Sequence, residues 1–215
     1  MTVPRIAIVV GSTRPGRRGS AVGRWVLAQT KGREGGSYDV LELEQFGLTL
    51  LAESITPAAA NRCYQNRQTC VWSRTIDDYD GFVWVTPEYN FGVPAAFKNA
   101  LDLLYPEWNH KAVGFVAYGV DGGVRAVEQW RSIVANVRML GTRAQVALSI
   151  YDDWQLEHFA PLERRADELD GVLNEVEQLA AVLEPLRSAD IAKFMEYEPA
   201  RDIWRRESAD GPTAL

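Results

Sequence analysis

Short apolar runs alternate along the chain with longer segments whose apolar residues recur at helical spacing. Runs rich in β-branched and aromatic residues predict strands, and the amphipathic segments predict helices. The pattern contains five such pairs. The expected strands are residues 5–10, 38–43, 81–86, 111–118 and 143–150, and the expected helices are residues 20–31, 58–77, 94–104, 123–139 and 160–185.

This alternation predicts an α/β fold. Strand–helix–strand units form parallel sheets that are covered on both faces by helices, through right-handed crossovers. A chain of 215 residues suits one such domain with a sizeable core. In a doubly wound sheet, ligands bind beyond the carboxyl ends of the strands, where the strand order reverses. We therefore look for chemistry in the loops that follow strands.

Three of these loops have an unusual composition. They are GSTRPGRRGS after the first expected strand, TPEYNFGVP after the third and AYGVDGGVR after the fourth. Each is rich in glycine, proline or small polar residues, and each precedes an expected helix. We expect the three loops to meet at one edge of the sheet.

The first loop predicts a phosphate site. Ser12 and Thr13 offer hydroxyl donors, glycines allow close approach of the backbone, and the helix that starts near Ser20 directs free N–H groups outward. The loop matches neither the GxxxxGK[ST] nor the GxGxxG motif. The alternative is a solvated basic turn in which Ser20 only caps the helix. Positive charge comes from Arg14, Arg17 and Arg18.

The second and third loops offer surfaces for a planar ring. Tyr89 and Phe91 are flat apolar groups, Asn90 is an amide that can bond a heterocycle, and prolines stiffen this loop on both sides. The third loop adds Tyr118 and three glycines that allow close backbone approach. Both loops also fit plain strand-to-helix turns. Taken together, the three loops predict a site for a phosphorylated planar ligand, which FMN fits better than a dinucleotide.

The runs GSTRPGRRGSAVGRWV, PEYNFGVPAAFKNALDLL and YGVDGGVRAVEQWR, in this order and at these intervals, resemble the NADPH-dependent FMN reductase family of flavodoxin-like proteins. The resemblance covers about residues 5–150, and PEYN with the helix after it is its most specific part. It implies a five-stranded doubly wound parallel sheet of order 2-1-3-4-5, FMN as cofactor, NADPH or NADH as electron donor, and a homodimer or homotetramer. It further implies a ping-pong transfer of electrons to a flavin, quinone or similar small acceptor, and it leaves open whether reduced FMN is released to a partner monooxygenase.

The resemblance also assigns cofactor contacts. Those at the FMN phosphate are Ser12, Arg14, Arg17, Arg18, Gly19 and Ser20. Those along the isoalloxazine are Pro87, Glu88, Tyr89, Asn90 and Phe91, and those at its other edge are Tyr118, Gly119, Gly122 and Gly123. Many family members have Ser-x-Asn where this chain has Arg17, Arg18 and Gly19, so we expect Ser20 and local amides to take over these contacts. No catalytic side chain is required, because the cofactor supplies the chemistry. Glu88 fits a helix N-terminal charge or loop anchor equally well.

Composition narrows the function classes. The formal net charge of −6 argues against broad binding to nucleic acid or anionic membranes. No apolar run approaches the roughly 18 residues that span a bilayer, and the first residues lack the features of a signal or transit peptide. Cys63 and Cys70 lie seven residues apart in an expected helix, too far for a disulfide, and His110 and His158 are isolated, so no metal site is expected. The sequence predicts a cytoplasmic protein.

The C-terminal part is less informative. We expect the domain to span residues 1–185 and a C-terminal extension to span residues 186–215, bounded by Pro185 and containing aromatic residues that pack on the domain or on a partner subunit. Two alternatives to a reductase remain. One is a non-catalytic electron carrier like a flavodoxin, and the other is a flavin-binding sensor or interaction protein.

Overall fold

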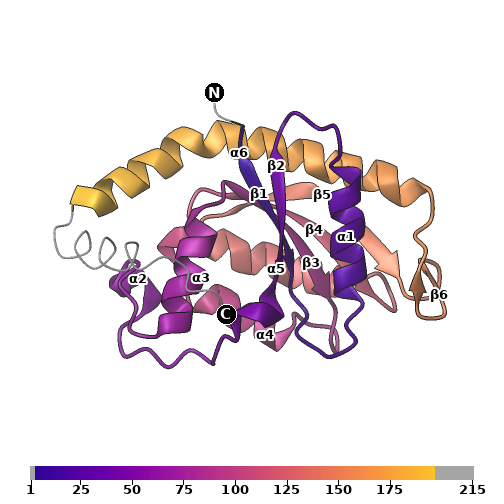
Figure 1. The fold of residues 1–215 in the computed structure, drawn as a ribbon, viewed down its shortest axis with the longest axis horizontal. Coiled ribbons are helices and arrows are strands. Elements are labelled where there is room, and N and C mark those ends of the chain that lie inside the picture. Colours follow the sequence, from indigo (N-terminus) through magenta and orange to yellow (C-terminus); the bar gives the residue numbers. More distant parts are fainter. Residues whose placement is uncertain (1–2, 197–215) are drawn as a thin grey trace.

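Five parallel strands form the centre of the protein in the computed structural model, which describes residues 3–196 (Figure 1). The strands lie side by side in the order β2-β1-β3-β4-β5, which confirms the expected flavodoxin-like topology. Their carboxyl ends point toward the bottom of Figure 1. Their bounds are β1 (Arg5–Val10), β2 (Ser37–Glu42), β3 (Gly81–Pro87), β4 (Ala112–Gly119) and β5 (Leu140–Ser149).

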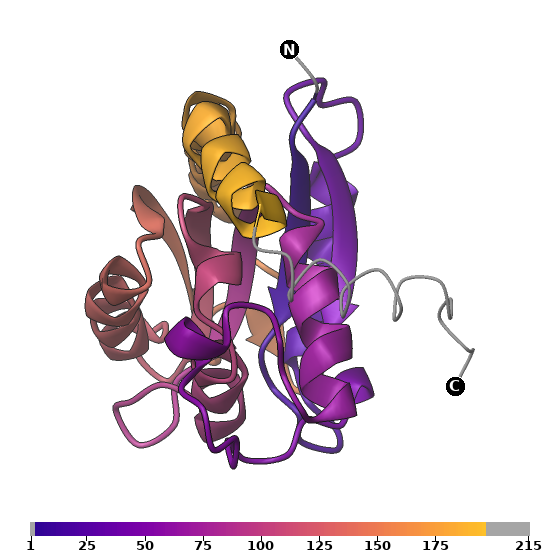
Figure 2. The ribbon, with the colours of Figure 1, turned by 90° about the vertical axis from the view of Figure 1, so that its left-hand side faces the viewer.

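Helices cover both faces of the sheet, as the turned view shows (Figure 2). On one face, α1 (Gly19–Gln29) and α6 (Arg164–Glu196) pack against the strands, and α6 spans nearly the full width of the molecule in Figure 1. On the other face lie α3 (Arg67–Asp77), α4 (Ala95–Asp102) and α5 (Val124–Asn136). Because both faces are covered, β1 from Ile6 onward and all of β3 are buried, which explains their continuous apolar sequence.

The expected helix 58–77 is in fact two helices, α2 (Pro57–Ala60) and α3. Asn61 and Arg62 separate them with left-handed backbone angles, φ 46° and 72°. The buried Arg62 guanidinium pairs with Asp77, with 2.6 Å between Nε and Oδ2, so a tertiary ion pair fixes this break. The side chain of Asn66 then accepts hydrogen bonds from backbone amides in the first turn of α3. Cys63 therefore lies in the break, and the placement of both cysteines on one helix is wrong.

The last helix also differs from its expected bounds of 160–185, because α6 continues through Pro185 to Glu196. A proline inside a helix removes one backbone hydrogen bond. Here the following turns are anchored by Arg187, whose guanidinium lies 3.0 Å from Asp80 Oδ1 and 2.7 Å from the carbonyl of Ala180. Phe194 is buried against Arg62. The division expected after Pro185 thus falls within α6, and residues 197–215 lie outside the described part of the chain.

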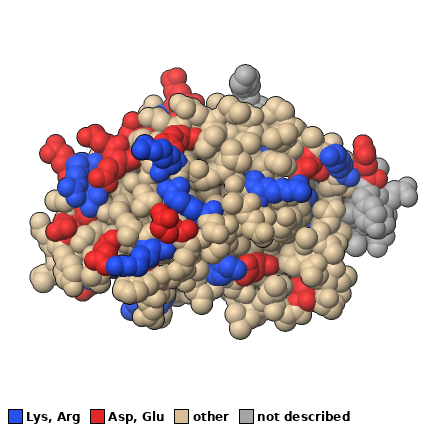
Figure 3. Space-filling model, turned by 180° about the vertical axis from the view of Figure 1, so that it is seen from behind, with Lys and Arg blue, Asp and Glu red and all other residues tan. Residues whose placement is uncertain are grey.

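Small elements complete the fold. They are the 3₁₀ helices η1 (Leu43–Phe46) and η2 (Pro106–Trp108) and the hairpin of β6 (Trp154–Gln155) and β7 (His158–Phe159). None of the helices in residues 3–196 combines the length and the apolar character needed to cross a bilayer. On the face drawn in Figure 3, basic and acidic side chains lie interspersed.

Candidate cofactor site

The strand order reverses at β1, which pairs with β2 on one side and with β3 on the other. The loop after β1 leads to α1 on one face, whereas the loop after β3 leads to α4 on the opposite face. In sheets of this kind, ligands bind at the switch point, beyond the carboxyl ends of the strands. The loops meet there, because Ser12 Oγ lies 2.8 Å from Tyr89 Oη. The structure therefore brings the first two of the expected loops together.

The N-terminus of α1, at the end of the first loop, has no side-chain cap. The residue before the helix, Arg18, makes no capping side-chain bond, and the first turn holds no acidic residue. Gly19 begins the helix and is buried, and a Cβ atom there would lie 2.9 Å from Tyr118 Oη and 3.0 Å from Val10 Cγ1. The free N–H groups at the start of α1 can bind an anionic group, and the absence of a side chain at Gly19 lets such a group approach the backbone closely.

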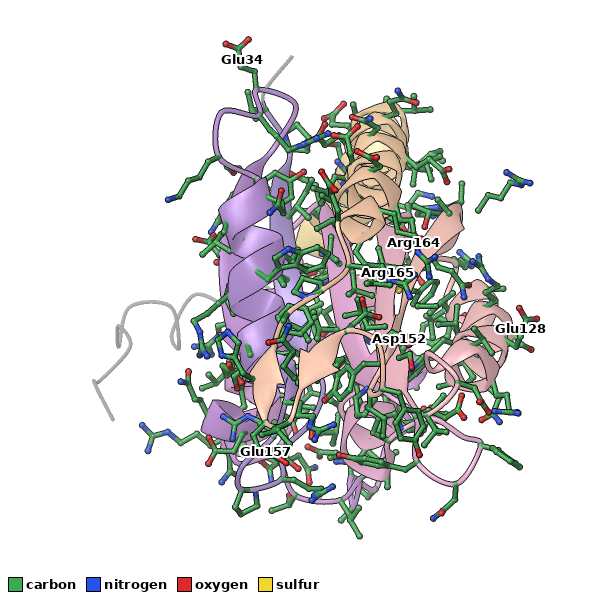
Figure 4. All side chains as sticks on the ribbon, turned by 90° about the vertical axis from the view of Figure 1, so that its right-hand side faces the viewer. Glu34, Glu128, Asp152, Glu157, Arg164 and Arg165 are labelled. Atoms are coloured by element: carbon green, nitrogen blue, oxygen red, sulfur yellow. The ribbon has the colours of Figure 1, made fainter. Side chains whose placement is uncertain are left out.

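The three arginines of the first loop have different surroundings. Arg17 pairs with Glu42, with 3.1 Å between Nε and Oε2. Arg18 pairs with Glu157 at 3.3 Å, and Figure 4 shows Glu157 near the hairpin beside the lower end of α1. Arg14 is exposed and forms no ion pair with any residue in the range 3–196. Of the three arginines of the first loop, only Arg14 has a charge that no carboxylate of the described chain offsets.

Glu88 anchors the second loop to α5. Its Oε2 accepts the backbone amides of Arg125 at 2.9 Å and Ala126 at 3.2 Å, and its Oε1 lies 3.3 Å from the guanidinium of Arg125. The side chain of Glu88 is almost fully buried. These contacts favour the helix-terminal anchor over a role for this carboxylate at the ring of a cofactor.

The next residues form a tight turn. Tyr89 and Gly92 exchange two backbone hydrogen bonds, of 3.1 and 3.0 Å. Asn90 and Phe91 at the centre have φ values of 50° and 64°, the left-handed pair that a type I′ turn requires. Gln129 holds the turn by donating to the carbonyl of Phe91 at 2.8 Å. Such angles cost about 1–3 kcal/mol per non-glycine residue, so strain of this kind points to a functional turn.

The turn presents two groups to solvent at the sheet edge. The amide of Asn90 is exposed and forms no hydrogen bond with the described residues. The ring of Phe91 is 63% exposed, and the guanidinium of Arg125 lies 4.1 Å from its centroid. Pro87, in contrast, is a buried residue of β3.

Two glycines of the third loop are needed for the backbone conformation and packing of the loop. Gly122 and Gly123 have φ values of 74° and 72°. A Cβ atom on either would lie 2.9 Å from the alanine Cβ atoms of the sheet, at Ala147 and Ala117 respectively. These contacts favour the strand-to-helix turn for both glycines. Gly119 is partly exposed and lies beside Glu88.

Tyr118, near the end of β4, directs its hydroxyl toward the first loop. The side chain is 6% exposed, and its Oη has no hydrogen-bond partner within residues 3–196. Burial raises the pKa of Tyr118 above its usual range, and the neighbouring Tyr89 raises this pKa further. A protonated, buried hydroxyl without a partner, a close glycine and an uncapped helix together fit the phosphate group of FMN. The structure thus places the Tyr118 hydroxyl beside the first loop.

The hairpin β6–β7 also reaches this edge, which the sequence pattern did not indicate. Trp154 is buried, its ring centroid lies 4.7 Å from that of Phe159, and the Arg18 guanidinium lies 5.5 Å from the Trp154 ring. The alternation of Trp154 and Phe159 around a polar turn is the one signal that could have revealed this hairpin.

Two hollows of the surface lie away from the three loops. A groove of about 490 Å³ runs between α2, α4 and α5, and a hollow of about 260 Å³ adjoins the start of α3. Within residues 3–196, no group of three or more His, Cys, Asp or Glu side chains is arranged to hold a metal ion.

Comparisons with known proteins identify the family. The family model described as NADPH-dependent FMN reductase matches residues 4–153. An NAD(P)H-dependent FMN reductase of Schizosaccharomyces pombe is 34% identical over 150 residues, which cover 70% of this chain and 75% of that protein. One of Saccharomyces cerevisiae is 32% identical over 144 residues, covering 63% of this chain and 75% of that protein.

Solved structures share the fold. The flavoenzyme NAD(P)H:acceptor oxidoreductase FerB of Paracoccus denitrificans superposes with a TM-score of 0.66 at 18% identity, covering 83% of this chain and 98% of that chain. The apo form of an NADH:FMN oxidoreductase superposes with a TM-score of 0.58 at 18% identity, covering 81% of this chain and 89% of that chain. The match of the family model over most of the chain, together with the two yeast relatives, shows that the chain belongs to the NADPH-dependent FMN reductase family, whose members use FMN and NAD(P)H.

Proposed function

We propose that FMN binds at the switch point, beside the first two loops, and that the enzyme passes electrons from NADPH or NADH to a flavin, quinone or similar small acceptor in a ping-pong cycle. When bound, FMN supplies the redox chemistry. The observation that carries the proposal is the contact of Ser12 with Tyr89, because it joins the two loops of the switch point beside the uncapped α1 helix.

The first loop is proposed to hold the phosphate. Arg14 contributes the charge that no described carboxylate offsets, and Ser12 and Ser20 contribute hydroxyl groups. Gly19 contributes the close backbone approach at the start of α1. Arg17 and Arg18 position the loop and do not contact the phosphate, because they form ion pairs with Glu42 and Glu157.

The second loop is proposed to orient the ring. Asn90 offers an amide for hydrogen bonding, and Tyr89 and Phe91 offer aromatic surface on a turn that α5 holds rigid through Glu88 and Gln129. A rigid turn fixes the ring relative to an incoming nicotinamide, which favours transfer by orientation. Gly119 would allow a close approach at the ring edge, and Pro87, Gly122 and Gly123 shape the loops.

We further propose a homodimer or homotetramer. The open groove that α4 and α5 line is a candidate interface, since α4 follows the PEYN turn directly. A cytoplasmic location and the release of reduced FMN to a monooxygenase are compatible with this proposal and stay predictions.

The experiment combines a visible spectrum with initial rates. Purified protein loaded with FMN should show flavin bands that NADPH or NADH bleaches. Initial rates at several acceptor concentrations, with free FMN or a quinone as acceptor, should give parallel double-reciprocal lines. Tight FMN binding with negligible NAD(P)H oxidation would instead support an electron carrier or a flavin-binding sensor.

A further inference from the structure

We propose that Tyr118 is a phosphate ligand of FMN, reaching the phosphate from β4, rather than a contact at the edge of the isoalloxazine ring. The inference rests on the proposed position of FMN at the first loop. It concerns a side chain two strands away from the loop that it completes, since β3 lies between β1 and β4.

The side of the sheet on which Tyr118 lies supports this role. Tyr118 packs in the core under α1 and α6, together with Val10 and Val22. The PEYN turn leads instead into α4, on the opposite face. The Tyr118 hydroxyl therefore reaches the N-terminus of α1, where a Cβ atom on Gly19 would lie only 2.9 Å away.

The hydroxyl itself lacks a partner. The Ser12 hydroxyl and the Gly19 backbone lie close enough to lower the pKa of Tyr118, against the larger effect of burial, but neither forms a hydrogen bond with its Oη. Ser12 Oγ is instead 2.8 Å from Tyr89 Oη. A buried polar group that is left unpaired is unfavourable, and native proteins rarely keep one without a ligand, an ion or water. The position of this oxygen, beside the first loop and the start of α1, suits an acceptor atom of a ligand held there.

The negative charge of the phosphate explains why the neutral Tyr118 hydroxyl is useful there as a hydrogen-bond donor. A phosphate monoester carries a charge between −1.5 and −2 near pH 7 and has three strong acceptor oxygens. In the first loop, carboxylates already compensate Arg17 and Arg18, which leaves Arg14 and the dipole of α1. The burial of Tyr118 raises its pKa, so the hydroxyl keeps its proton and donates it in a hydrogen bond.

The test compares FMN with riboflavin, which lacks the phosphate. Apoprotein is titrated with each flavin by fluorescence quenching, for the wild type, for Tyr118→Phe and for the control Tyr151→Phe, whose side chain is 73% exposed. A hydrogen bond to a charged group makes the expected loss of FMN affinity in Tyr118→Phe about ten- to a hundredfold. Riboflavin affinity should stay unchanged, and Tyr151→Phe should bind both flavins as the wild type does.

Two results would overturn the role of Tyr118. An equal loss of affinity for both flavins would make it a ring contact, and an unchanged FMN affinity would make it a core residue only. If the wild type binds neither flavin, or binds both equally, the proposed phosphate site itself fails. These outcomes keep the two proposals separate.

A second measurement does not depend on the flavin ring. Inorganic phosphate at millimolar concentration should raise the melting temperature of the wild-type apoprotein and have a smaller effect on Tyr118→Phe. Without phosphate, Tyr118→Phe should melt at or above the wild-type temperature, because the aromatic ring stays and an unpaired hydroxyl is removed. Equal phosphate shifts in both proteins would contradict the proposal.

Discussion

The Oε2 atom of Glu88 lies 2.9 Å from the backbone nitrogen of Arg125, so the acidic residue of the PEYN motif binds the first turn of α5. This contact crosses from the end of β3 to the helix that follows β4. It makes the turn that carries Asn90 part of a rigid unit with α5, and it gives the acidic residue of the motif a structural role.

Glu88→Gln should therefore lower the free energy of unfolding but have little effect on the rate of flavin reduction. The amide keeps one acceptor oxygen but loses the charge at the helix N-terminus, so we expect a loss of about 1–2 kcal/mol in the free energy of unfolding. Urea denaturation measures this loss. Stopped-flow reduction of bound FMN should stay within about threefold of the wild-type rate. A large loss of rate at unchanged stability would assign the carboxylate to the chemistry.

Arg14 and Arg17 should differ in their effect on FMN binding. Arg14→Ala should weaken FMN binding by about 1.5–3 kcal/mol, as expected for a charge-assisted hydrogen bond to phosphate. Arg17→Ala should weaken it less, because Glu42 already pairs with Arg17. Isothermal titration calorimetry compares the two, with the exposed Arg24→Ala as control. Equal effects of Arg14→Ala and Arg24→Ala would place Arg14 in solvent.

Asn90 is best tested with glycine. Its φ of 50° disfavours alanine, so Asn90→Ala changes both the turn and the amide, whereas Asn90→Gly removes the amide and keeps the backbone favourable. We expect Asn90→Gly to shift the visible spectrum of bound FMN and to slow its reduction by NADPH or NADH. The loss of one hydrogen bond to the ring corresponds to about 1–3 kcal/mol, or roughly five- to hundredfold in rate. Wild-type spectra and rates would make the turn purely structural.

Lys111 should make stability depend on alkaline pH. Burial lowers the pKa of its amine to about 8, although Asp77 partly offsets this, and in the unfolded chain the pKa stays near 10.5. Between these values the unfolded state binds more protons, so the free energy of unfolding rises with pH, by up to about 1.4 kcal/mol per unit. The rise should disappear in Lys111→Met and persist in the exposed Lys31→Met. Urea denaturation from pH 7.5 to 10 tests this, and parallel curves for all three proteins would contradict it.

The oligomer prediction can be tested without disturbing α6. Phe194 is buried against the domain, so a deletion that begins at residue 188 would remove part of the core. A chain that ends at residue 196 keeps every described contact. Light scattering of both chains at micromolar concentration should show a dimer or tetramer for the full chain. A monomeric full chain would refute the prediction, and an unchanged oligomer in the shorter chain would exclude a need for residues 197–215.

The strands and the site loops could be predicted from sequence, because strands buried on both faces have continuous apolar runs and the loops carry unusual residues. The break at Arg62 could not, since its ion pair with Asp77 depends on tertiary packing. The continuation of α6 past Pro185 likewise depends on Arg187 and its distant partner Asp80. The direction of the Tyr118 hydroxyl depends on which side of β4 faces α1, and residue composition does not encode that side.

The position of α6 has a consequence for synthesis in the cell. Strands β3, β4 and β5 leave the ribosome before α6, yet α6 supplies most of the cover on one face of these strands. Domains fold as units while the chain grows from its N-terminus, and exposed apolar surface at this stage favours aggregation. That face of the sheet stays open to chaperones, and to neighbouring nascent chains, until the turns of α6 from Leu169 to Ala180 have emerged and docked.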